Sequence, residues 1–171
     1  MSQKASKSEE NQGEAEPRIT NGLRGFETIG AFLEEDGWHP QKLENRTIYR
    51  VYFSGNNGDL RCYAQVRTDL EQFLFYVIAP VKAPAPERAV VAEYLTRANY
   101  GLRIGNFEMD YNDGEVRYKS SIDFEGTALN PALIKNTIYP AVHTMDFYLP
   151  GLLSVMYGNL EPADAIEEIE N

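Results

Sequence analysis

Two short turn sequences constrain the fold of this chain more than any other feature. Asn57-Gly58 lies within RTIYRVYFSGNNGDLRCYAQVRT (residues 46–68), and Asp113-Gly114 lies within FEMDYNDGEVRYKSSIDF (residues 107–124). Asn-Gly or Asp-Gly between stretches of alternating apolar and polar residues is a strong signal for a two-residue β-hairpin. Strands joined by such turns are antiparallel. The sequence therefore predicts a sheet built mainly from antiparallel hairpins.

The first hairpin has a register that keeps its apolar residues on one face. A turn at Asn57-Gly58 gives apolar pairs on one side and polar or aromatic pairs on the other: Phe53 with Cys62, Val51 with Ala64, Tyr49 with Val66, Ser54 with Arg61, Tyr52 with Tyr63 and Arg50 with Gln65. A slip of one residue would set apolar side chains against polar ones. We therefore expect this register.

The second hairpin carries opposite charges at matching positions. A turn at Asp113-Gly114 places Asp110 opposite Arg117 and Glu108 opposite Lys119. Such cross-strand pairs contribute only about 0.2–1 kcal/mol each, so they specify register more than stability. We interpret both acidic residues as pairing residues and not as a catalytic pair of carboxylates.

Helical segments flank the predicted strands. Apolar residues at helical spacing predict helices over residues 22–36 and 85–101, and a long helix begins near Asn130 and ends at Gly158. Pro140 and Pro150 lie inside the long helix, where each removes a backbone donor, so we expect a kink or break there. The segment EQFLFYVIAP (71–80) is apolar on both faces and is expected to be a central or covered strand.

The order of these elements is helix, three strands, helix, two strands, helix. It predicts an α+β fold, in which a mainly antiparallel five-stranded sheet has its helices packed on one face. The length of 171 residues suits a single domain, expected over residues 21–160. Residues 1–20 are polar and are expected to form a disordered N-terminal tail. Residues 161–171 are expected to form an acidic C-terminal tail with at most a short helical turn.

The charge argues against several classes of partner. The net charge is −10, and about half of it lies in residues 161–171. No block of the chain has the basic patch typical of proteins that bind nucleic acid or anionic membranes. No run of about 18 apolar residues is present, and the single cysteine, Cys62, cannot form an intrachain disulfide. We therefore expect a cytoplasmic protein that binds neither nucleic acid nor membrane.

Few residues show the pattern that catalysis or metal binding requires. His39 and His143 are the only histidines, and neither has a Cys, Asp or second His at metal-ligand spacing. Cys62 falls on the apolar face of the first hairpin, where a cysteine behaves as a small hydrophobe. No glycine-rich run precedes a helix in the manner of a phosphate-binding loop. We expect no catalytic residues, no cofactor and no metal site.

Tyrosines and arginines gather on the second face of the first hairpin. They are Arg50, Tyr52, Arg61, Tyr63 and Arg67. If helices cover the apolar face, these side chains line the open face of the sheet. Tyr and Arg are enriched in protein interfaces, which makes this group a candidate protein-interaction face. Ordinary strand propensity explains the same tyrosines equally well.

Several short motifs resemble those of the YbjN family of bacterial proteins. They are Asn99 at the end of the second helix, Gly105–Glu108, Asp113–Tyr118, and Tyr157-Gly158 followed by Pro162 and Ala165. FLEEDGW (32–38) resembles the first helix of the family, and the likeness covers roughly residues 22–168. The resemblance implies a type III secretion chaperone-like fold that often dimerises and a sensory or regulatory role. It implies no catalytic residues, because the family has no established reaction.

Three hypotheses for function follow. The first is a protein-binding module, chaperone-like or regulatory, that acts by contact with a protein partner as a homodimer. The second is a sensor of a small ligand, with a pocket between the sheet and the long C-terminal helix. The third, an enzyme, ranks last because no catalytic constellation is apparent.

Overall fold

The computed structural model describes residues 19–171, so most of the N-terminal segment expected to be disordered lies outside the described residues. The elements are α1 (Asn21–Glu35), β1 (Gln41–Lys42), β2 (Ile48–Ser54), β3 (Asp59–Arg67), β4 (Gln72–Lys82), a 3-10 turn (Ala85–Glu87), α2 (Arg88–Gly101), β5 (Asn106–Met109), β6 (Glu115–Asp123), α3 (Pro131–Tyr157) and α4 (Pro162–Glu170). The predicted α+β class is confirmed. None of the helices in the described residues is both long enough and apolar enough to cross a membrane.

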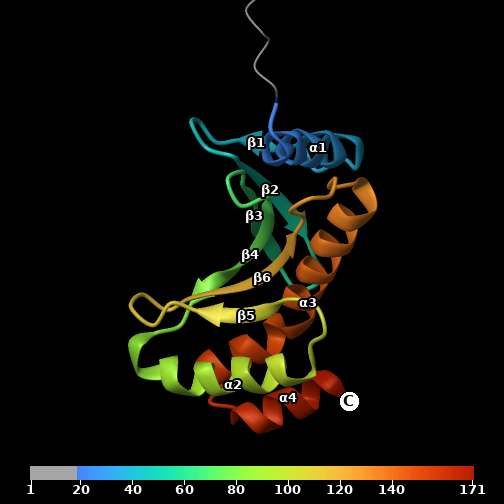
Figure 1. The fold of residues 1–171 in the computed structure, drawn as a ribbon. Helices are drawn as coiled ribbons and strands as arrows, with labels where there is room; N and C mark the ends of the chain where they lie inside the picture. Colours follow the sequence, from blue (N-terminus) through green and yellow to red (C-terminus); the bar gives the residue numbers. More distant parts are fainter. Residues whose placement is uncertain (1–18) are drawn as a thin grey trace, which may run out of the picture.

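The sheet has six strands in the order β1-β2-β3-β4-β6-β5, and all neighbours are antiparallel (Figure 1). The expected count of five was wrong because β1 was missed. This strand contains only Gln41 and Lys42, which pair with Arg50 and Tyr49. Two residues are too few to produce an alternating pattern in a sequence.

The predicted register of the first hairpin was wrong by two residues. Val51 lies opposite Cys62, and Tyr52 lies opposite Arg61. The turn is centred on Asn56 and Asn57, and the N–H of Gly55 donates to the carbonyl of Gly58 over 2.9 Å. A shift of two residues leaves every side chain on its original face, so the predicted faces are confirmed.

The second hairpin is shifted in the same way. Glu108 lies opposite Arg117, and the five residues 110–114 connect β5 to β6. The Asp110 N–H donates to the Glu115 carbonyl at 2.9 Å, and the Asp110 carbonyl accepts from Gly114 at 2.8 Å. Gly114 has a φ of +78°, a conformation that glycine adopts without the steric cost of a Cβ. The predicted pair of Asp110 with Arg117 is therefore not formed.

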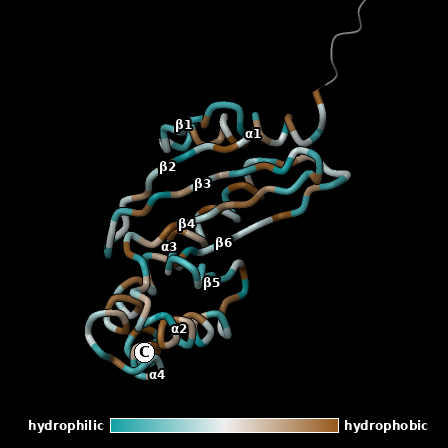
Figure 2. Tube along the Cα trace, turned by 90° about the vertical axis from the view of Figure 1, so that its left-hand side faces the viewer, coloured by the Kyte–Doolittle hydropathy of each residue, from teal (hydrophilic) through white to brown (hydrophobic). Residues whose placement is uncertain are grey.

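Helices cover one face of the sheet. In Figure 1, α1 lies at one end of the molecule, α2 and α4 lie at the other, and α3 runs between them. The tube in Figure 2 shows the same layering from the side. β4 lies between β3 and β6, so its predicted central position is confirmed. Its inward side chains, Phe73, Phe75 and Val77, are fully buried.

Neither proline breaks the long helix, because α3 runs without interruption through Pro140 and Pro150. Many of its side chains are buried against the sheet and the other helices, including Ile138, Val142 and Met145. This burial favours a continuous helix over the loss of two backbone hydrogen bonds.

The C-terminal segment forms a nine-residue helix, α4, which packs on α2 and α3. Ala165 is fully buried in this contact. The hydroxyl of Tyr148 on α3 donates to Glu170 over 2.7 Å. The acidic residues therefore lie on the outer surface of a docked helix.

Candidate protein-interaction face

The face of the sheet opposite the helices is lined by polar, aromatic and basic side chains. We call it the open face, and it comprises Arg50, Tyr52, Arg61, Tyr63, Gln65, Arg67, Leu74, Tyr76, Ile78, Arg117 and Lys119. All of these are exposed or half-buried except Ile78, which retains 8% of its surface. Alternation along each strand produces this arrangement, because every second side chain points away from the core.

The structure brings four of the five predicted residues together. Tyr52 lies directly opposite Arg61, and Arg50 lies directly opposite Tyr63. Tyr52 is 61% exposed, and the guanidinium carbon of Arg61 lies 5.8 Å from the centre of the Tyr63 ring. Arg67 lies on the same face but at the far end of β3, opposite Gln72 of β4. It is therefore peripheral to the group.

The open face extends onto β4 and β6, which sequence reasoning did not include. Tyr76 of β4 pairs with Tyr63, and Lys119 of β6 pairs with Tyr76. Arg117 lies over Tyr76, with 4.5 Å from its guanidinium carbon to the ring centre. The segment EQFLFYVIAP is apolar on both faces, which indicates that its second face also carries large side chains. The sequence does not show which strands lie beside it, so this face could not be joined to the predicted group.

Glu108 holds two of the cations. It accepts hydrogen bonds from Arg117, with 2.9 Å to Nε and 2.8 Å to Nη2, and it also bonds Lys119. Partial burial raises the pKa of Glu108, but the hydrogen bonds and charges of Lys119 and Arg117 lower it by more, so the pKa lies below its usual value. Among the described residues, Arg61 and Arg67 make no ion pair.

Arg50 is held by a neighbouring strand. Its Nη2 donates to the side-chain oxygen of Gln41 over 2.5 Å, and its Nε is buried without a partner among the described residues. A hollow of about 250 Å³ lies beside the Tyr52–Arg61 pair, and Asp59 and residues 78–80 of β4 also line it. The open face therefore offers one exposed ring, Tyr52, and one half-buried ring, Tyr63. Next to them lies the Arg61 guanidinium, which makes no ion pair among the described residues and can bind a carboxylate.

The histidines and the cysteine lie away from this face. His143 is an exposed residue of α3 whose ring stacks on Tyr139 at 5.8 Å between ring centres, and His39 has a φ of +50° in the turn after α1. Cys62 is fully buried, and burial raises the pKa of its thiol well above the ordinary value. Within residues 19–171, no three His, Cys, Asp or Glu residues are grouped so as to hold a metal ion.

The ligand pocket expected between the sheet and the long helix would lie where side chains of α3 and β4 are buried. Val142, Met145 and Leu149 of α3 are almost completely buried, as are Phe75 and Val77 of β4. Such burial is typical of a close-packed core. The hypothesis of a sensor with a pocket in this position stays a prediction.

Comparison with known proteins identifies relatives of the fold. The family model YbjN, described as "Putative bacterial sensory transduction regulator", matches residues 26–154. A chain of the crystal structure of the ExsC–ExsE complex aligns with a TM-score of 0.54 and 12% identity, over 77% of this chain and 96% of its own length. YbjN from E. coli, described as a putative transcription regulator, aligns with a TM-score of 0.54 and 10% identity, over 84% of this chain and 93% of its own. No curated protein matches the sequence.

These identities establish a shared fold and no more. The expected type III secretion chaperone-like fold is confirmed by the ExsC–ExsE match. The matched residues 26–154 include every strand and end within α3, so α4 lies outside the family model. The open face lies inside it.

Proposed function

The chain belongs to the YbjN family, and we propose that it acts as a non-enzymatic regulatory module that binds a protein partner through its open face. One observation carries this proposal. Tyr52, Arg61, Tyr63 and Tyr76 form a continuous patch on adjacent strands, and Tyr52 is 61% exposed. Large rings beside arginines are the residues that contribute most to binding at protein interfaces.

The partner surface is expected to be acidic and to offer apolar contacts. The open face presents Arg61 and Arg67 without ion pairs among the described residues, although the whole chain has a net charge of −10. A carboxylate is the group that an exposed guanidinium binds best, in a bidentate geometry. The tyrosine rings would pack against apolar side chains around it.

The fold comparison supports the same class of function. One structural neighbour comes from a complex of two proteins, ExsC and ExsE. From this neighbour we carry over only one property to this chain, namely that the fold can bind another protein. A homodimer, expected from the family resemblance, is the assembly that we propose, and the cytoplasm, expected from the composition, is the proposed location.

The proposal is tested by affinity capture from a bacterial lysate with three forms of the full chain. They are the wild type, the open-face variant Tyr52→Ala/Arg61→Ala, and the control Tyr100→Ala/Arg103→Ala, which removes an exposed ring and an exposed arginine beyond the open face. We expect the same partner with the wild type and the control, and its loss with the open-face variant. The purified partner should then bind the wild type in titration calorimetry. Equal capture by all three forms would contradict the role of the open face.

The homodimer is tested separately by sedimentation equilibrium of the wild type. A mass of about twice the 19.4 kDa of one chain is expected. A single species of one chain across the concentration range would exclude it. This measurement does not depend on the partner. The homodimer can therefore be excluded without affecting the proposed role of the open face, and the reverse also holds.

A further inference from the structure

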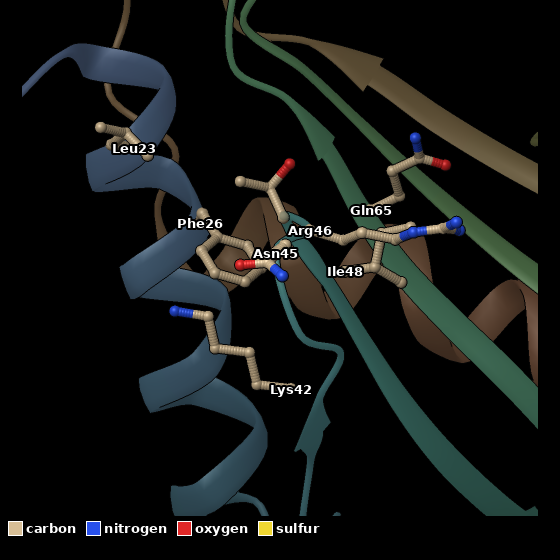
Figure 3. A pocket seen from close by; sticks show the side chains of 8 residues that line it. Leu23, Phe26, Lys42, Asn45, Arg46, Ile48 and Gln65 are labelled. Carbon is tan, nitrogen blue, oxygen red and sulfur yellow. The ribbon is translucent and has the colours of Figure 1, made fainter.

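A second hollow lies between α1 and the β1–β2 end of the sheet (Figure 3). It has a volume of about 670 Å³ and opens to solvent. Its walls come from the first turns of α1, the loop that joins β1 to β2, and the adjoining residues of β2 and β3. Ligand pockets of about 300–1,000 Å³ are typical for small molecules. The hollow is therefore large enough for a metabolite.

The floor of the hollow is apolar and fixed. Phe26 of α1 is only 4% exposed, and its ring stacks on Tyr49 with 4.3 Å between ring centres. Leu23, one turn earlier in α1, is 42% exposed. Ile48 of β2 also lines the hollow. The exposed leucine lies beside an aromatic ring that stacking holds in place. An apolar group that covered this surface would leave water, which favours binding.

One cation lies on each side of this floor. The ammonium of Lys42 is 5.3 Å from the centre of the Phe26 ring. Figure 3 shows Lys42 extending toward α1, whereas Arg46 extends the other way, along the sheet. Neither side chain forms an ion pair with any residue in the described part of the chain. The chain has 26 acidic and 16 basic residues, yet no Asp or Glu lines the hollow.

Two of the three uncharged polar side chains that line the hollow lack partners among the described residues, whereas the Thr47 hydroxyl donates to the carbonyl of Val66 over 2.6 Å. The side-chain amides of Asn45 and Gln65 make no hydrogen bond within residues 19–171. Asn45 has a φ of +55°, so the loop that carries it turns tightly beside the floor. The hollow thus combines many hydrogen-bond donors and two positive charges with an apolar base. A ligand that matches it has hydrogen-bond acceptors, a negative charge and an apolar body.

We infer that this hollow binds a small organic anion. An apolar ring or chain of the ligand lies over Phe26 and Leu23, and its carboxylate, sulfonate or phosphate group binds Lys42 or Arg46. Such a ligand would also contact Gln65, which belongs to the open face. The inference does not depend on the proposed function, because it rests on residues other than Tyr52 and Arg61.

The test is a fluorescence titration of the full chain with 8-anilinonaphthalene-1-sulfonate, an aromatic anion of this class. We expect one saturable site on the wild type. The variant Lys42→Gln/Arg46→Gln should bind the probe at least about 10-fold more weakly, which is about 1.4 kcal/mol. The control Arg103→Gln/Lys135→Gln removes the same charge from α3 and the loop after α2, and it should bind as the wild type does.

A third variant separates the apolar contribution from the charge. Leu23→Ser keeps both cations and replaces an exposed side chain, so it should fold normally and weaken binding several-fold. Hydrogen exchange of the wild type should show that the probe protects amides in residues 42–48. Equal affinity in all variants, binding at many weak sites, or protection confined to other segments would overturn the inference. If Lys42→Gln/Arg46→Gln fails to fold, the Leu23→Ser titration and the exchange experiment decide it.

Discussion

Asn57 and Asp146, which lie 89 residues apart, are joined by two hydrogen bonds, and Asn57 is the donor in both. The Asp146 carboxylate accepts a hydrogen bond of 2.8 Å from the Asn57 N–H, and the Asn57 side chain donates to the Asp146 carbonyl over 3.0 Å. The N–H of Asn56 also donates to Asp146, at 2.9 Å. Pro150, four residues after Asp146 in α3, lacks the N–H that would otherwise bond this carbonyl. The β2–β3 turn therefore replaces a hydrogen bond that the helix cannot make.

This contact predicts a large loss of stability when the carboxylate is removed. Asp146 is only 6% exposed, and Asp146→Ala would leave the two turn N–H groups without their charged acceptor. We expect the free energy of unfolding, measured by urea denaturation, to fall by about 2–4 kcal/mol. The control Asp164→Ala changes an exposed acidic residue of α4 and should cost less than about 0.5 kcal/mol. Equal effects of the two variants would show that the contact contributes little.

The ion pairs of Glu108 are expected to make the free energy of unfolding depend on pH. Its pKa is below the ordinary value of 4.5 in the folded chain. The stability that this carboxylate contributes is therefore present above pH 4.5 and is lost as the pH falls through the folded pKa. At pH 7 we expect Glu108→Gln to lower the free energy of unfolding by about 1 kcal/mol, because the pairs with Arg117 and Lys119 are only partly buried.

The difference between Glu108→Gln and the wild type should shrink to zero in acid. Urea denaturation at several pH values from neutral to strongly acidic measures it. Glu93→Gln serves as the control, because Glu93 forms a more exposed ion pair with Arg97 within α2. That variant should lose at most about 0.5 kcal/mol at neutral pH. A Glu108→Gln effect that persists unchanged in acid would rule out an origin in the charge.

The faces of the strands could be predicted from the sequence, whereas the registers could not. Alternation of residues such as Val51 and Tyr52 determines the face locally, and a shift of two residues leaves it unchanged. In the observed register of β2 and β3, the turn N–H groups of Asn56 and Asn57 bond Asp146, which lies on α3, far from the hairpin in the sequence. No property of residues 46–68 carries that information.

Only part of the candidate site could be predicted, because a local pattern shows which residues share a hairpin but not which strands lie next to each other in the sheet. Tyr52 and Tyr63 belong to one hairpin, so local pairing was enough to bring them together. Tyr76 joins them through the pairing of β4 with β3. Arg117 joins them only because β6 returns to pair with β4, although α2 and β5 separate these two strands in the sequence. The hollow at Lys42 depends on β1, which is too short to be recognised from the sequence.

Removal of the Asn99 side chain is expected to weaken the edge of the sheet at β5. Its side-chain oxygen accepts from the N–H of Phe107 at 2.7 Å, and its amide donates to the carbonyl of Phe107 at 3.1 Å. The side chain thus takes the place of a neighbouring strand along β5, which is one of the two edge strands of the sheet. Asn99→Ala should lower the free energy of unfolding by about 1–3 kcal/mol and speed hydrogen exchange of the Phe107 amide. Thr96→Ala, on an exposed position of the same helix, should leave that amide protected.

Cys62 provides a probe of global unfolding. The thiol is fully buried and its pKa is raised by desolvation, so the reactive thiolate is absent in the folded state. We expect a thiol reagent such as iodoacetamide to modify Cys62 only as fast as the chain opens, and rapidly in denaturant. The destabilised variant Asp146→Ala should react faster than the wild type. Rapid modification of the folded wild type would contradict the position of Cys62 in the core.

The docking of α4 is tested at Ala165. This side chain is fully buried against the rest of the domain, whereas Ala163 on the same helix is exposed. Ala165→Glu would bury a charge without a partner, so we expect α4 to detach and the Tyr148–Glu170 hydrogen bond to break. The melting temperature should fall and a protease should cleave after residue 157, while Ala163→Glu should behave as the wild type. Since α4 lies outside residues 26–154, the Ala165→Glu chain should retain a folded domain, and complete unfolding would show that α4 is part of the minimal fold.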